Sequence, residues 1–130
     1  MDIAPLPKNE AARQSPIDPR AWQNIQILQQ PGSPDLLAKI IDLYLKDSET
    51  LVDKIMAAAA AGDLPGLQDA AHSLKSRSAT LGAWQVAEIC GQLERGARTR
   101  NMGTAVAASL PQAFAAACEI FHAELLKRAA

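Results

Sequence analysis

Apolar side chains recur every three or four residues along most of this sequence, which is the period of a helix that buries one face. The longest stripe covers residues 36–55, over roughly five turns. The same period predicts long helices over 63–82, 83–98 and 104–127, and a short helix over 19–28. Short connections make neighbouring helices antiparallel, so the pattern favours a bundle.

Start and stop signals separate these helices. The first two helices follow an acid or serine beside a proline, at Asp18-Pro19 and Ser33-Pro34-Asp35. Asp63 is placed to cap the third helix and Gly82 to end it. Pro111 either kinks the last helix or marks its true beginning, because proline cannot continue the backbone hydrogen bonding of a helix interior.

Composition supports a helical fold. Alanine occupies 26 positions, whereas valine, isoleucine and threonine together occupy 16, and these β-branched residues are the typical strand formers. We therefore predict an all-α domain, an antiparallel up-down four-helix bundle with a short N-terminal helix, over residues 17–130. Residues 1–16 contain three prolines and no hydrophobic period, which is typical of a flexible arm or linker.

The remaining composition narrows the class of function. A formal net charge of −1 does not favour binding to nucleic acid or to an anionic membrane surface. The uncharged stretch over 101–118 contains polar residues and a proline, so it is a poor membrane span. Cys90 and Cys118 lack the spacing of a zinc or redox site. We predict a cytoplasmic monomer that binds no metal and needs no cofactor.

One histidine lies apart from the predicted core. At about 100° per residue, Leu67, Leu74 and Leu81 form one line along the third long helix, and His72 lies roughly 140° away from it. Polar neighbours share its face, among them Gln68 and Lys75. A lone histidine on a helix is usually only a surface residue, so a functional role for His72 must be judged from the residues around it.

The run over 71–83 reads AHSLKSRSATLGA. It resembles the signature of histidine-containing phosphotransfer (HPt) domains, roughly A-H-x-L-K-G-x-S-x-x-L-G-A, at eight positions. The segments over 17–19, 58–67 and 92–94 are also similar to that family, so only residues 1–16 fall outside the resemblance. Ser76 stands where the family commonly has glycine, and serine adds only a hydroxymethyl group at this position.

The resemblance implies a phosphorelay role. His72 would accept a phosphoryl group from an aspartate of a response-regulator receiver domain and pass it to another receiver, with Mg²⁺ bound by the partner. Glu94 aligns with a family position that contacts the second ring nitrogen, and Lys75 would offset phosphate charge. Gln68 would support the same site, and the partner would dock near Ser76 and Ala79. The chain would have no kinase activity of its own, although it could be a module of a hybrid histidine kinase.

The sequence lacks the motifs of two other classes of helical protein. The phosphoacceptor domain of a histidine kinase has an acid directly after its histidine and a proline four residues after the histidine, where this chain has Ser73 and Ser76. A di-iron bundle needs paired Glu-x-x-His motifs, and this chain has none among its two histidines. A helical interaction module that docks a partner without phosphotransfer stays open as the alternative.

Overall fold

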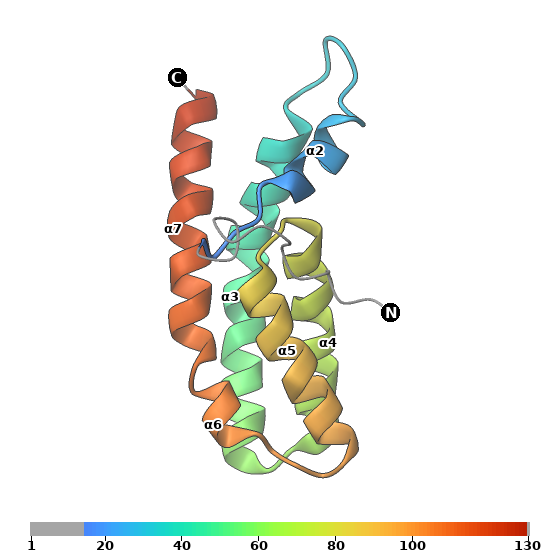
Figure 1. Cartoon of the computed structure of the whole chain (residues 1–130), viewed down its shortest axis with the longest axis vertical. Helices are drawn as coiled ribbons and strands as arrows, with labels where there is room; N and C mark the ends of the chain where they lie inside the picture. Colours follow the sequence, from blue (N-terminus) through green and yellow to red (C-terminus); the bar gives the residue numbers. More distant parts are fainter. Residues whose placement is uncertain (1–14, 130) are drawn as a thin grey trace.

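The computed structural model describes residues 15–129. All regular structure in that part of the chain is helical: α2 (Arg20–Gln26), α3 (Leu36–Ala61), α4 (Leu64–Thr80), α5 (Trp84–Arg98), α6 (Thr104–Ala107) and α7 (Leu110–Ala129). The four long helices α3, α4, α5 and α7 alternate in direction (Figure 1). The predicted all-α bundle with a short N-terminal helix is confirmed.

Side-chain caps start α3 and α4. The cap of α4 is Asp63, as the sequence predicts, whereas the cap of α3 is Asp35 rather than Ser33, the serine before the proline of the predicted start signal. The Asp35 carboxylate accepts the Ala38 N–H at 3.2 Å at the start of α3. The Asp63 carboxylate accepts the Gly66 N–H at 3.0 Å at the start of α4. Each cap satisfies a backbone donor that has no partner within the helix, which stabilises the first turn by about 1 kcal/mol.

Two helix boundaries are now defined: the start of the last helix, which the sequence left open, and the end of the first helix, which was predicted too late. Pro111 is the second residue of α7, so it marks the beginning of that helix, and the short α6 precedes it separately. The first helix ends earlier than predicted, at Gln26, and only Ile25 on it is buried. Ile27 and Leu28 are 79% and 65% exposed, because the chain turns away before a further helical turn can carry them to the core.

Aromatic and aliphatic side chains from all four long helices fill the core. Tyr44 packs between Phe114 and Phe121, with ring centroids 5.9 and 5.2 Å apart. Its hydroxyl shares a 2.7 Å hydrogen bond with the buried Ser78 hydroxyl, which ties α3 to α4. The largest fully buried side chains are Phe121, Ile17, Leu37, Ile41, Ile55, Leu67, Leu74, Leu81, Leu93, Leu110 and Val86.

The segment before α2 is attached to the turn between α4 and α5. The Trp84 indole N–H donates to the Ser15 carbonyl at 2.7 Å, and the Asp18 N–H donates to the Gly82 carbonyl at 2.8 Å. Gly82 has a φ of +77°, and a Cβ there would overlap the Asp18 carbonyl oxygen. The turn therefore requires glycine. Most of the predicted arm, residues 1–14, lies outside the described residues.

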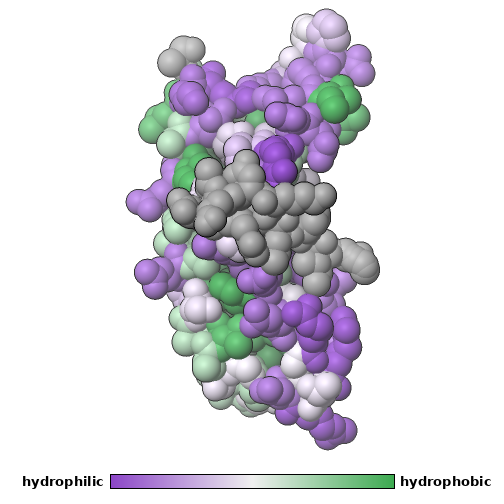
Figure 2. Space-filling view, in the orientation of Figure 1, coloured by the Kyte–Doolittle hydropathy of each residue, from purple (hydrophilic) through white to green (hydrophobic). Residues whose placement is uncertain are grey.

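The C-terminal helices are unusually apolar. The stretch Thr104–Ala129 is long and apolar enough, by length and composition alone, to cross a membrane. In this structure it contributes Leu110, Phe114, Ala117 and Phe121 to the core, which accounts for one of its faces. Figure 2 shows hydrophobic side chains gathered at the centre and left of the lower half of the visible face, whereas the lower right is hydrophilic and the upper end is mostly hydrophilic with separate hydrophobic side chains.

Candidate functional site

Helix α4 presents two different faces. Leu67, Leu74 and Leu81 are fully buried along the line that the wheel predicts for the core. The His72 side chain, on the opposite face, is 55% exposed. The helix is therefore anchored by its leucines and does not need the imidazole for packing, which leaves the ring available to a partner in solution.

The His72 ring contacts a buried carboxylate on the neighbouring helix α5. Its Nδ1 lies 2.8 Å from Oε2 of Glu94, whose side chain is only 6% exposed. Lys75, whose side chain is also 6% exposed, donates its ammonium N–H to the other carboxylate oxygen at 2.5 Å. The Arg98 guanidinium forms an ion pair with Oε2 at 3.3 Å. One carboxylate thus holds three groups from two helices.

This contact fixes which ring nitrogen carries the proton. A carboxylate can only accept hydrogen bonds, so the short contact with Glu94 assigns the proton of the neutral ring to Nδ1. The lone pair of a neutral imidazole is then on Nε2, at the tip of the exposed ring. Nε2 is therefore a nucleophilic nitrogen that faces solvent, while the hydrogen bond from Nδ1 to Glu94 fixes the orientation of the ring.

Glu94 remains ionised in this position. Burial raises the pKa of Glu94, but the hydrogen bonds donated by Lys75 and His72 lower it by more, so the pKa lies below its ordinary value of 4.5. A permanent negative charge behind the ring stabilises positive charge that develops on the imidazole when Nε2 forms a bond. Glu94 can therefore orient the ring and also stabilise its charged form.

The other residues predicted near His72 differ in their surroundings. Lys75 is buried against Glu94, although the sequence places it on the solvent side of the wheel. Gln68, one turn before His72, is half-buried. Ser76 is exposed and Ala79 is half-buried, so the α4 surface that follows His72 carries only small side chains. Such a surface lets another protein approach the ring closely.

Arg98 is a site residue that the sequence did not single out. In the sequence, Arg98 is one of three arginines near the end of its helix, with Arg95 and Arg100. Their attraction to the negative end of the helix dipole is enough to explain basic residues at this place. The available signal was its position four residues after Glu94, since side chains at this spacing lie one turn apart on the same helix face. Its side chain is 55% exposed.

Cys90 is also close to this cluster in sequence, one turn before Glu94, but it is chemically inert. Burial raises the pKa of its thiol to about 12, so the thiolate is absent near neutral pH. Within residues 15–129, no group of three or more histidine, cysteine, aspartate or glutamate side chains is placed to hold a metal ion.

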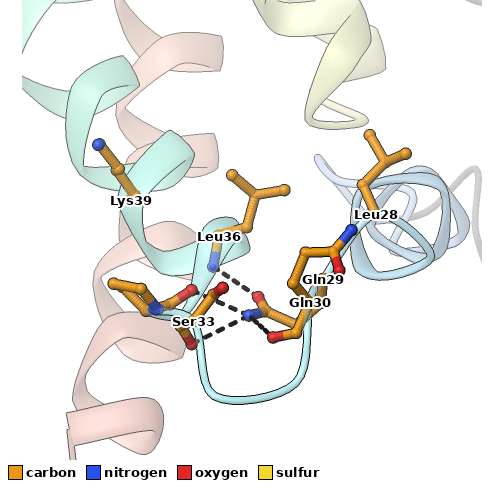
Figure 3. Close-up of a pocket in the computed structure, with 7 residues that line it drawn as sticks. Leu28, Gln29, Gln30, Ser33, Leu36 and Lys39 are labelled. Atoms are coloured by element: carbon orange, nitrogen blue, oxygen red, sulfur yellow. Dashed lines mark hydrogen bonds between the residues drawn. The ribbon is translucent and has the colours of Figure 1, made fainter.

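Three hollows lined by described residues do not include His72 in their walls. One, of about 210 Å³, is at the loop between α2 and α3, where the Gln29 side chain bridges the loop (Figure 3). Its amide donates to the carbonyls of Gln30, Ser33 and Pro34, and it accepts the Leu36 N–H at 2.8 Å. These contacts shape the start of α3. His72 does not line this hollow and lies on an exposed face of α4, which a protein partner can reach.

Comparisons with known proteins agree with this geometry. The family model described as the Hpt domain matches residues 39–124. The crystal structure of histidine-containing phosphotransfer protein B (HptB) from Pseudomonas aeruginosa PAO1 is similar, with a TM-score of 0.77 and 28% sequence identity, covering 85% of this chain and 95% of that chain. No curated protein sequence matches significantly. The chain therefore belongs to the Hpt domain family, whose members are phosphocarriers rather than kinases and interact with receiver domains of response regulators, and it has a histidine phosphotransfer role in a phosphorelay.

Proposed function

We propose that His72 is the phosphoacceptor of this phosphorelay module. One observation carries the proposal: the half-exposed imidazole is held through Nδ1 by the buried Glu94, which leaves Nε2 free to react. Neutral imidazole is a competent nucleophile near neutral pH without further activation. His122, on the outer face of α7, is exposed as well, but within residues 15–129 no carboxylate forms a hydrogen bond or ion pair with its ring.

The transfer step follows from this arrangement. The Nε2 lone pair attacks the phosphorus of an aspartyl phosphate on a receiver domain. A nitrogen–phosphorus bond forms, the bond between phosphorus and the aspartate oxygen breaks, and the aspartate carboxylate leaves with the electron pair. The proton on Nδ1 stays on its hydrogen bond to Glu94, so the positive charge of the phosphorylated ring lies next to a carboxylate. Reversal of the step phosphorylates a second receiver.

The receiver docks on α4 around His72. Ser76 and Ala79 supply the small surface that lets the acidic site of the receiver reach the ring, and Gln68 supports the phosphoryl group from the preceding turn. Mg²⁺ is bound by the receiver, because this site lacks a carboxylate cluster among the described residues. The module acts as a monomer, since a single copy carries the complete His72 and Glu94 pair. It acts in the cytoplasm, where proteins of the Hpt family are typically found.

Label transfer tests the proposal. Purified protein is incubated with phosphorylated receiver domains, and phosphate on this chain is measured for the wild type, His72→Gln and the matched control His122→Gln. We expect transfer to the wild type and to His122→Gln, and none to His72→Gln. Transfer that survives in His72→Gln contradicts the proposal. Receiver binding without transfer to the wild type would instead support the alternative, an interaction module.

A further inference from the structure

Two cations lie beside Glu94, and they differ in their freedom to move. The side chains of Lys75 and Glu94 are each 6% exposed, and the ammonium lies 2.5 Å from the carboxylate. Moving Lys75 away would leave a buried charge without its partner, which is costly. Arg98 is 55% exposed and its ion pair with Glu94 is longer, 3.3 Å. The Arg98 side chain can return to water when it leaves, and Glu94 keeps its bond to Lys75, so Arg98 can leave Glu94 more easily than Lys75 can.

Arg98 also lies close to the reacting ring. The Arg98 Nη2 and the His72 Nδ1 both contact the same oxygen, Oε2 of Glu94, at 3.3 and 2.8 Å. The guanidinium is therefore beside the imidazole, and a rotation of its long side chain can bring it around the ring toward Nε2. Its planar fork of N–H donors matches the oxygens of a phosphoryl group.

We propose that Arg98 is the residue that binds the phosphoryl group once His72 carries it, while Lys75 serves to hold Glu94 in place. This inference rests on the proposed phosphoacceptor role of His72. With a neutral ring, the charges of Lys75, Glu94 and Arg98 leave one net positive charge in the cluster. A phosphoryl group on Nε2 adds negative charge and attracts Arg98 away from Glu94, whose bonds to Lys75 and Nδ1 remain in place.

The division of roles differs from the one that the resemblance implies. There, Lys75 offsets the phosphate charge directly, since it follows the histidine by three residues. Its burial against Glu94 gives it a positioning role instead. The charged residues within one helical turn of His72 and Glu94 along their own helices are Asp69, Lys75, Arg95 and Arg98. Of these, Arg98 combines a direct contact in the cluster with an exposed head group.

The test uses the phosphorylated full chain. Phosphoramidate, a small chemical donor, phosphorylates the wild type, Arg98→Ala, Arg98→Lys and the matched control Arg95→Ala, and ³¹P NMR follows the phosphohistidine signal as pH is changed. A nearby cation favours the dianionic form of the phosphoryl group. We therefore expect Arg98→Ala to raise the pKa of the phosphoryl group by roughly half a pH unit, Arg98→Lys to restore part of the difference, and Arg95→Ala to leave the pKa unchanged.

The same titration can overturn the inference. An unchanged phosphoryl pKa in Arg98→Ala, or an equal rise in Arg95→Ala, would show that Arg98 does not contact the group. Failure of the proposed function looks different, because it appears as the absence of transfer between wild-type protein and receiver domains. The chemical donor makes the ³¹P measurement independent of any receiver, so the two results are read separately.

Discussion

Replacing Glu94 by alanine should destabilise the whole bundle, although the residue belongs to a surface site. The substitution leaves the Lys75 ammonium, which is 6% exposed, without its 2.5 Å partner. Breaking one side of a buried ion pair costs about 3–5 kcal/mol, because the remaining charge stays buried. Total stabilities of domains are typically about 5–15 kcal/mol, so a large fraction of the stability of this bundle is at risk.

The magnitude can be measured by urea unfolding and by thermal melts followed with circular dichroism. For a domain of this size the expected loss corresponds to a fall in Tm of about 10–20 °C. The double variant Glu94→Ala/Lys75→Met replaces the stranded charge with an apolar side chain of similar length. We expect it to recover most of the lost stability but not phosphotransfer, because the Nδ1 contact of His72 is still missing.

Two results would refute this reasoning. A loss below about 1 kcal/mol in Glu94→Ala is the magnitude of an exposed pair and would mean that Lys75 reaches water easily. A double variant no more stable than Glu94→Ala would mean that the stranded charge is not the cause of the loss. The matched control for an exposed ion pair is Asp42→Ala, which removes the partner of Lys46 and should change the free energy of unfolding by less than about 0.5 kcal/mol.

Three further predictions concern pH, docking and the turn. Because the pKa of Glu94 is lowered on folding, its ionised form adds stability above pH 4.5 that is lost as pH falls through the folded pKa, so the stability difference between wild type and Glu94→Gln should shrink in acid melts below that pH. Ser76→Trp should slow transfer from a receiver by roughly tenfold or more with an unchanged Tm, whereas Arg77→Trp should not slow it, because Arg77 lies about 140° from His72 around α4. Equal transfer rates for both variants in a label-transfer assay would place docking elsewhere. Gly82→Ala should cost about 2 kcal/mol or more in urea unfolding, because φ is +77° and a Cβ meets the Asp18 carbonyl; a neutral effect would show that the turn can relax.

The sequence predicts this fold well because its signals are local. Hydrophobic period, the Asp35 and Asp63 caps and the glycine at the end of α4 each act within one helical turn, so they can be read without knowing the neighbouring helices. The early end of α2 was harder to predict. Ile27 and Leu28 continue the apolar pattern, but nothing packs over them once the chain turns toward α3.

The site is only partly predictable for a related reason. The wheel places His72 opposite the core, since that depends on α4 alone. The burial of Lys75 depends on how closely α5 lies against α4 and on which side chain faces it, and a single helix carries no such information. The place of Arg98 in the site is not predictable from α5 alone, because Arg98 contacts Glu94, and Glu94 becomes buried only when α4 and α5 pack together.

The most direct test of the central claim is the position of the phosphoryl group on the His72 ring. The protein is phosphorylated by a receiver domain, and long-range ¹H–¹⁵N correlations of the imidazole are recorded before and after, together with the ³¹P spectrum. We predict a neutral ring that is protonated on Nδ1 before transfer and phosphorylated on Nε2 afterwards, with Nδ1 still protonated against Glu94. Phosphate on Nδ1, on His122 or on no histidine would contradict the account.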